Sequence, residues 1–202
     1  MDRSMLPVTA TALALLMSSP ALAAVDEVFE TEAGPVQVTT VVEGLSHPWA
    51  IAFLPGGEML VTERAGALRV ATTDGVLSDT INGVPDVDAR RQGGLLDVAL
   101  DPDFETNRLV YLSFSEAGNG GNSTAVARGR LADDLSGLEN VEVIFSQQPK
   151  VESTAHFGSR LVFDNDGHLF VALGDRSSAQ FRGRAQDLDS HIGTIVRINP
   201  DG

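Results

Sequence analysis

The chain has 202 residues, of which 43% are hydrophobic, enough to form a core in one or two domains. It carries 14 basic and 28 acidic side chains, which gives a formal net charge of −14 at pH 7. This acidic balance argues against binding a nucleic-acid backbone, which requires a basic surface. Because the sequence has no cysteine, thiol catalysis, iron–sulfur clusters, cysteine-ligated zinc and disulfide bonds are excluded.

Residues 1–23 have the pattern of a secretory signal peptide. A short polar start precedes an apolar run over residues 8–17, and the Ala-Leu-Ala sequence of residues 21–23 fits a signal-peptidase site. The run has about half of the roughly 20 apolar residues that a membrane-spanning helix needs. We therefore expect cleavage after Ala23 or Ala24, export to the periplasm, and no membrane span in the mature chain.

The rest of the chain, residues 24–202, is predicted to be all-β. Short apolar or β-branched runs alternate with turns rich in Gly, Pro, Asp and Asn, and no helical period of apolar residues is evident. The glycine-rich segment 118–122 is interpreted as a flexible connection. The predicted strands cover residues 36–42, 49–54, 59–62, 68–70, 95–100, 108–114, 161–163, 168–173 and 194–198.

Three of the predicted strand pairs are alike, each with an apolar strand, a turn and a second apolar strand. Taking Phe53, Leu100 and Phe163 as equivalent gives spacings of 47 and 63 residues, near the length of a four-stranded propeller blade. We therefore expect a β-propeller of four-stranded blades, with about three blades in this chain; a β-sandwich is the alternative. Since three blades do not close a ring, we expect the sequence to be the N-terminal part of a longer protein.

The clearest candidate for catalysis flanks the turn over residues 164–167. This turn lies midway between His156 and Asp175, so antiparallel pairing of the flanking strands would place these two side chains opposite each other. A carboxylate that holds one imidazole nitrogen leaves the other free to act as a base. The adjacent Gly158 and Gly174 permit close approach to the backbone. A histidine that only satisfies backbone groups at a strand end is the alternative.

A second candidate is the segment 90–97. Gly93 and Gly94 precede a predicted strand and allow a tight approach, while Gln92 offers both a hydrogen-bond donor and an acceptor. The segment is not a phosphate-binding loop, because no Lys-Ser or Lys-Thr pair follows the glycines. An ordinary loop is the alternative here.

Patterns of metal ligands are weak, and no residue is assigned to a metal. Asp187 and Asp189 lack the dense spacing of oxygen ligands found in calcium-binding loops. The four histidines are scattered and form no helical pair, which argues against zinc. Three of them, His47, His168 and His191, have no evident partner in the sequence.

Several segments together resemble the soluble aldose sugar dehydrogenases that depend on pyrroloquinoline quinone (PQQ), within the glucose/sorbosone dehydrogenase-like quinoproteins. The similarity covers roughly residues 36–202 and implies a six-bladed propeller, of which this chain would supply about half. It lies in residues 44–55 (GLSHPWAIAFLP), 91–98 (RQGGLLDV), 102–104 (PDF), 156–161 (HFGSRL), 185–189 (AQDLD) and 193–197 (GTIVR).

The resemblance implies oxidation of the anomeric hydroxyl of an aldose to a lactone. His156 would be the general base that takes the hydroxyl proton while hydride passes to PQQ, and Asp175 would orient it. Gln92 and His156 would contact the cofactor, and an external acceptor would take the electrons. The cationic cofactor-binding residues and the calcium ligands of this family lie in later blades, outside these 202 residues. The chain alone would therefore bind the quinone poorly.

One position departs from the glucose-specific relatives, which carry an acidic residue immediately before the histidine. Here Ala155 stands in that place, which favours a broader aldose specificity. Two other interpretations stay open. A calcium-dependent propeller lactonase would need acidic and amide ligands that converge on the axis. A non-catalytic propeller that binds a carbohydrate or another partner would keep the motifs for packing.

Overall fold

The computed structural model describes residues 25–202, so the predicted signal peptide, residues 1–23, lies outside the described residues. The chain divides into two compact units, the first ending at Thr40 and the second running over Val41–Gly202. In the first unit, β1 (Asp26–Thr31) pairs antiparallel with β2 (Gly34–Thr39). Within residues 25–202, no helix combines the length and the apolar character needed to cross a membrane.

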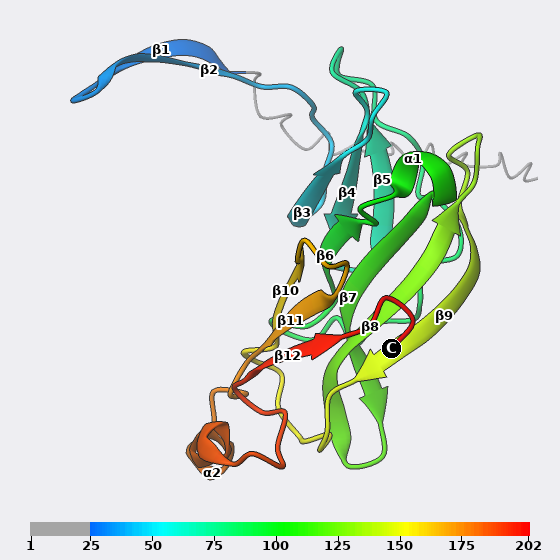
Figure 1. Ribbon diagram of the computed structural model, residues 1–202. Coiled ribbons are helices and arrows are strands. Elements are labelled where there is room, and N and C mark those ends of the chain that lie inside the picture. The colour runs from blue at the N-terminus through cyan, green and yellow to red at the C-terminus, as the bar shows by residue number, and fades with distance from the viewer. Residues whose placement is uncertain (1–24) are drawn as a thin grey trace, which may run out of the picture. The chain divides into compact units, whose positions relative to one another are not determined.

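The second unit contains three consecutive antiparallel sheets (Figure 1). The first sheet consists of β3 (Pro48–Phe53), β4 (Met59–Glu63) and β5 (Ala67–Ala71). The second consists of β6 (Leu95–Leu100), β7 (Leu109–Gly118), β8 (Gly121–Leu131) and β9 (Leu138–Ser146). The third consists of β10 (Gly158–Phe163), β11 (Leu169–Leu173) and β12 (Ile195–Ile198). Short helical segments are α1 (Phe104–Asn107), α2 (Ala179–Arg182) and a 3₁₀ turn (Gly183–Gln186).

The first strands of the three sheets lie next to one another. Strand β6 contacts β3 on one side and β10 on the other, and the remaining strands of each sheet follow in chain order. Such a succession of small meanders is typical of propeller blades. The prediction of an all-β chain is confirmed. Among the described strands, however, only the central sheet has the predicted four, and the number of blades and the closure of a ring stay predictions.

Hydrophobic layers on both faces of the central sheet hold the three sheets together. Because side chains along a strand point alternately to opposite faces, neighbouring residues of β7 enter different layers. Leu112 and Phe114 pack into the layer shared with the first sheet, and Tyr111 packs into the layer shared with the third. There its ring meets that of Phe163 edge-on, with centroids 5.0 Å apart. Strands β6, β7 and β8 of the central sheet are therefore mostly buried on both faces, which accounts for their continuous apolar runs, whereas β9 is partly exposed.

The glycine-rich segment 118–122 is a tight hairpin, so the interpretation as a flexible connection is wrong. Asn119 and Gly120 are the two turn residues between β7 and β8, and Gly118 pairs with Gly121. Gly120 has a φ of +86°, a conformation that glycine adopts without strain. Strands β8 and β9 are absent from the predicted set, since polar and charged residues interrupt their apolar pattern.

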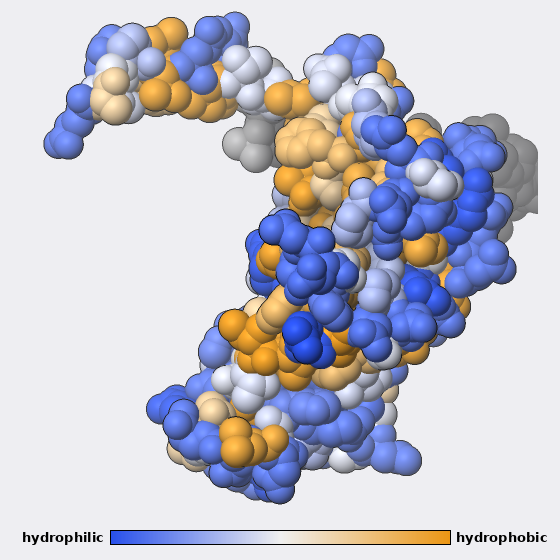
Figure 2. Space-filling model, viewed as in Figure 1, coloured by the Kyte–Doolittle hydropathy of each residue, from blue (hydrophilic) through white to orange (hydrophobic). Residues whose placement is uncertain are grey.

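Apolar side chains remain exposed on the two outer sheets. Trp49, Ile51 and Phe53 of β3 are exposed, as is Ile195 of β12, and Figure 2 shows apolar residues gathered over β3. Within the unit Val41–Gly202, the described residues thus leave an apolar face uncovered on the first sheet and a single exposed apolar side chain on β12.

Candidate functional site

The structure brings His156 and Asp175 into contact at the open end of the β10–β11 hairpin. The imidazole Nδ1 of His156 lies within hydrogen-bonding distance of Oδ1 of Asp175. Gly158 pairs with Leu173. Two residues further along each strand, the same register places His156 opposite Asp175, as the sequence predicts. The proximity of these two side chains therefore follows from the local pairing of the strands.

Asp175 is held as an anion by its neighbours. Its Oδ1 also accepts a hydrogen bond from the backbone nitrogen of Ser177 at 2.9 Å, and Nε of Arg182 lies 3.4 Å from Oδ2. The hydrogen bond from His156, followed by that from Ser177, lowers the pKa of the Asp175 carboxyl. Because an ionised carboxylate only accepts, Nδ1 of His156 carries a proton, and in the neutral ring Nε2 keeps a free lone pair. With 55% of the His156 side chain exposed, a ligand can approach that ring.

Gln92 reaches the same place from the loop before β6. Its Oε1 accepts a hydrogen bond from the backbone nitrogen of His156 at 2.7 Å, and its own backbone nitrogen donates to the carbonyl of Thr154 at 3.0 Å. The histidine has a φ of +49°, a left-handed conformation that is uncommon for a residue with a side chain. Gln92 therefore supports the unusual backbone at His156, and all three residues predicted for the site lie together.

A single arginine organises the loop that carries Gln92. Nη1 of Arg64 donates to the carbonyls of Ala89, Arg91 and Gly93 at 3.0, 2.7 and 3.1 Å. Three carbonyls that converge on one guanidinium fix the path of a loop that has no regular secondary structure. The position of Gln92 is thereby tied to the end of β4.

The glycines beside the pair serve the packing of the chain's own backbone. A Cβ atom on Gly174 would lie 2.0 Å from the carbonyl oxygen of His156. Gly158 has a φ of +78°, and a Cβ atom there would lie 2.5 Å from the carbonyl oxygen of Ala172. The close approach expected at these glycines thus occurs between the two strands of the hairpin.

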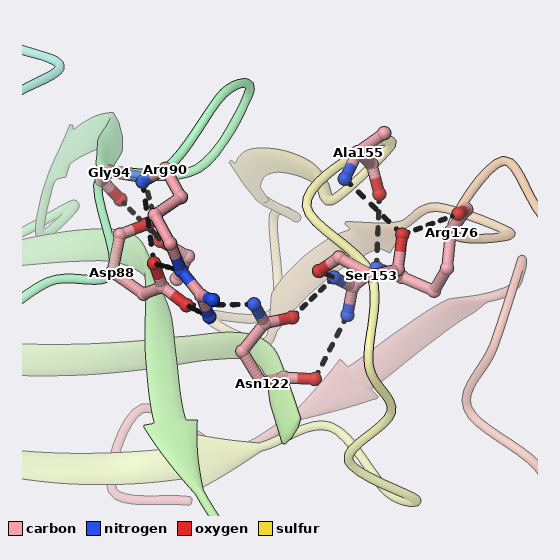
Figure 3. Close-up of polar contacts among 8 residues, drawn as sticks. Asp88, Arg90, Gly94, Asn122, Ser153, Ala155 and Arg176 are labelled. Atoms are coloured by element: carbon pink, nitrogen blue, oxygen red, sulfur yellow. Dashed lines mark hydrogen bonds and ion pairs between the residues drawn. The ribbon is translucent and has the colours of Figure 1, made fainter.

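Two buried polar residues near the site carried no clear sequence signal. Arg176 directly follows Asp175, and its guanidinium packs against the loop before His156 (Figure 3). Asn122 lies at the start of β8 and accepts a hydrogen bond from this guanidinium. An arginine after an aspartate is unremarkable in a sequence, and only the folded chain shows that it is buried.

A group of three potential metal ligands within residues 25–202 is explained by turn chemistry. Asp164, Asp166 and His168 lie close together in the β10–β11 turn. Oδ1 of Asp164 accepts hydrogen bonds from the backbone nitrogens of Asp166 and His168 at 2.9 and 2.8 Å, and its Oδ2 lies 3.2 Å from Nδ1 of His168. His168 therefore has a partner that the sequence did not indicate. Asp187 and Asp189 do not belong to this group.

A family model described as Glucose / Sorbosone dehydrogenase matches residues 45–202. The chain belongs to this family. The resemblance inferred from the sequence motifs is thereby confirmed, and the site residues 92, 156 and 175 all lie within the matched region.

Two curated proteins are similar to this chain in sequence. The aldose sugar dehydrogenase YliI of Escherichia coli is 48% identical over 169 residues, an alignment that covers 83% of this chain and 45% of that protein. An uncharacterized protein of Synechocystis is 39% identical over 192 residues, covering 87% of this chain and 46% of that protein. The chain thus spans about half the length of the curated relatives it matches.

Solved structures of similar proteins extend these findings. The apo-form of the soluble aldose sugar dehydrogenase from E. coli matches with a TM-score of 0.74 and 50% identity, covering 79% of this chain and 46% of that one. The PQQ-bound form of aldose sugar dehydrogenase from Streptomyces coelicolor matches with a TM-score of 0.70 and 29% identity, covering 92% of this chain and 51% of that one.

Proposed function

We propose that this chain forms part of a PQQ-dependent aldose sugar dehydrogenase, which oxidises the anomeric hydroxyl of an aldose and yields a lactone. Membership of the Glucose / Sorbosone dehydrogenase family supports an oxidoreductase that acts on sugars. The observation that carries the proposal is the exposed imidazole of His156, held at Nδ1 by Asp175 and free at Nε2.

In this proposal His156 is the general base. Its Nε2 takes the proton of the anomeric hydroxyl, and Asp175 keeps the ring in the required tautomer and stabilises the imidazolium that forms. The low pKa of the Asp175 carboxyl suits this role, because the carboxylate stays ionised at neutral pH and accepts the proton on Nδ1. Loss of the hydroxyl proton prepares the anomeric carbon to give up a hydride.

The residues present fit the edge of a quinone cofactor. Oε1 of Gln92 is occupied by the backbone nitrogen of His156, so its amide NH₂ group is the donor left for a ligand oxygen. The exposed ring of His156 lies next to it. When bound, PQQ supplies the two-electron redox chemistry that no side chain provides. Gln92 and His156 would therefore hold the cofactor from this half of the site.

The remaining parts of the proposal rest on the sequence. The relatives are about twice as long as this chain. Residues in that additional length would complete the propeller and would bind calcium and the acidic groups of PQQ. An external electron acceptor would reoxidise the cofactor, and the segment 1–23 would direct export to the periplasm. The turn cluster at Asp164 is not assigned to calcium, because its Oδ1 already binds two backbone nitrogens.

Two proteins test this function: the 202-residue chain, and a chimera in which residues 45–202 replace the matching segment of the E. coli aldose sugar dehydrogenase. We expect the chimera, loaded with PQQ and calcium, to reduce an artificial dye when an aldose is supplied, and the chain alone to show little turnover. A His156→Gln substitution in the chimera should lower kcat by about 10²–10⁴-fold, the usual contribution of a positioned base.

Three results would contradict the proposal. One is full turnover by a folded His156→Gln chimera. Another is hydrolysis of a lactone that requires calcium but no quinone, which would assign the site to a lactonase. The third is a PQQ titration of the chimera without any change in the absorbance of the quinone, which would point to a binding module.

A further inference from the structure

Behind His156 lies a buried arginine whose guanidinium has no carboxylate against it. Arg176 is 1% exposed. All four guanidinium hydrogen bonds that the structure describes end on uncharged acceptors. Burial lowers the pKa of Arg176 to about 10, which still leaves it charged at neutral pH. A buried charge is costly unless its donors are satisfied, so the fold at this point is built around the guanidinium.

The acceptors belong to the loop that leads into His156 and to the start of β8. Nε donates to the carbonyl of Ala155 at 3.1 Å, and Nη2 donates to the carbonyl of Ser153 at 2.7 Å. Nη1 and Nη2 donate to the backbone and side-chain oxygens of Asn122 at 3.0 and 2.5 Å. Figure 3 shows these contacts converging on the guanidinium from two separate segments of the chain.

The network continues to the loop of Gln92. Nδ2 of Asn122 donates to Oδ2 of Asp88 at 2.8 Å, and the carboxylate of Asp88 also binds Arg90 (Figure 3). Asp88 and Arg90 precede Gln92 in the same loop. Arg176 and Asn122 therefore connect the two segments that supply Gln92 and His156.

Arg176 also contacts the residues on both sides of the histidine. Its backbone nitrogen donates to the carbonyl of His156 at 3.3 Å, and its guanidinium carbon lies 4.0 Å from the ring centroid of Phe157. Together with the bond to Ala155, this fixes three consecutive residues, 155–157. In the chain, Arg176 is the neighbour of Asp175, so it is joined to both partners of the pair.

We propose that Arg176 is a positioning residue that sets the orientation of the His156–Asp175 pair through the carbonyls of Ser153 and Ala155. It does not touch the reacting atoms in this arrangement. Its effect on turnover rests on the proposed function, whereas its effect on the imidazole is a property of the chain itself. A guanidinium presents several donors in a fixed plane, and a lysine ammonium does not reproduce that fork. Arg176→Lys therefore retains the charge and removes the geometry.

Arg108 provides a control, because its guanidinium also donates to backbone carbonyls and lies near an aromatic ring, at a place away from His156. It donates to the carbonyls of Leu131 and Ala132, each at 2.9 Å, and lies 5.5 Å from the ring centroid of Phe104. Unlike Arg176 it also has a carboxylate partner, since its Nε lies 3.2 Å from Oδ1 of Asp133. It follows α1 and has no contact with the loop of His156. Arg108→Lys thus removes an arginine with two carbonyl partners and an aromatic partner without touching the pair.

The test measures the imidazole in the full ¹⁵N-labelled chain by NMR. The chain has four histidines, and His156→Gln identifies the resonances of His156. In the unaltered chain we expect one tautomer with the proton on Nδ1. In Arg176→Lys we expect the two ring-nitrogen shifts to move toward each other, because the tautomer is no longer fixed, while Arg108→Lys leaves them unchanged. In the chimera, kcat should fall about 10- to 100-fold in Arg176→Lys, with little change in KM.

The outcomes separate the two proposals. Unchanged His156 shifts in a folded Arg176→Lys chain would overturn the positioning role. So would failure of Arg176→Lys to fold while Arg108→Lys folds, since that would assign the guanidinium to the stability of the whole unit. A third outcome combines altered His156 shifts in the Arg176→Lys chain with a chimera, without substitutions, that oxidises no aldose. It would support the positioning role and contradict the proposed function.

Discussion

Oδ2 of Asp97, on β6, accepts a hydrogen bond from the backbone nitrogen of Leu161, on β10, at 2.7 Å. Its Oδ1 accepts another from Nη1 of Arg160 at 2.8 Å. The Asp97 side chain is 2% exposed. Leu161 follows a bulge in β10, where the register with β11 shifts between Gly158 and Leu161. Asp97 thus ties the central sheet to the irregular part of the strand that leads from His156.

Asp97→Ala should lower the free energy of unfolding by about 1–3 kcal/mol, because it leaves the buried Leu161 nitrogen without an acceptor. Urea denaturation at pH 7 measures this change. Asp133→Ala is the control: it also removes a carboxylate paired with arginine, but the Asp133 side chain is 79% exposed. We expect less than about 0.5 kcal/mol there. Equal losses in the two variants would contradict the role of Asp97.

The same bulge explains why the sequence located the pair correctly but the turn only approximately. Pairing symmetric about 164–167 predicts His156 opposite Asp175, yet next to the turn Phe163 pairs with Leu169, one residue out of that register. The extra residue in β10 restores the predicted register at Gly158 and Leu173. This bulge lies next to the contact with Asp97 of another sheet, and the alternation of residues along β10 does not predict it.

The apolar strands were predictable because they bury one or both faces, and the contact between His156 and Asp175 because it follows from the pairing of a local hairpin. The polar network behind the site was not. From the sequence, Asn122 would be expected in a turn and Arg176 on the surface. In the folded chain both are buried, where β8 and the loop before β10 come together. Their burial depends on contacts between segments more than 50 residues apart, 122 and 176. Short-range patterns in a sequence do not predict such contacts.

Asp88 should make the stability of the chain depend on pH. Hydrogen bonds from Arg90, and secondarily from Asn122, hold the pKa of its carboxyl well below its usual range. A lowered pKa in the folded state contributes stability above the ordinary carboxyl pKa of 3.8, and this contribution is lost as the pH falls toward the lower, folded-state pKa. Asp88→Asn should therefore lower the free energy of unfolding by about 1 kcal/mol at pH 7, and the difference should shrink below about pH 4.

Asp86→Asn is the matched control for Asp88. It removes the same charge from the same loop at an exposed position. Urea denaturation of both variants and the unaltered chain between about pH 7 and pH 2.5 gives the comparison. A loss of stability in Asp88→Asn that stays constant over this range would show that the carboxylate is not held in its ionised form by the fold.

Gly174→Ala should displace the backbone of His156. The added Cβ atom would lie 2.0 Å from the carbonyl oxygen of His156, and backbone on both strands must shift to relieve the contact. We expect the free energy of unfolding to fall by about 1–3 kcal/mol, as in overpacked cores. Gly183→Ala is the control, since nothing lies within 4 Å of its added Cβ and its φ of −60° suits alanine. That variant should be neutral or more stable by up to about 1 kcal/mol. Similar melting temperatures for both variants would contradict the close approach.

Asp175→Asn should impair turnover more than it impairs folding. The amide retains the shape of the side chain and can still bind the Ser177 nitrogen, but it no longer provides the carboxylate that holds the Nδ1 proton of His156. In the chimera we expect kcat to fall by about 10²–10⁴-fold, with little change in the melting temperature. Arg182→Gln, which removes the other charged neighbour of Asp175 at 3.4 Å, should lower kcat by less than about tenfold. If Asp175→Asn kept full activity with a folded chimera, Asp175 would not orient the base.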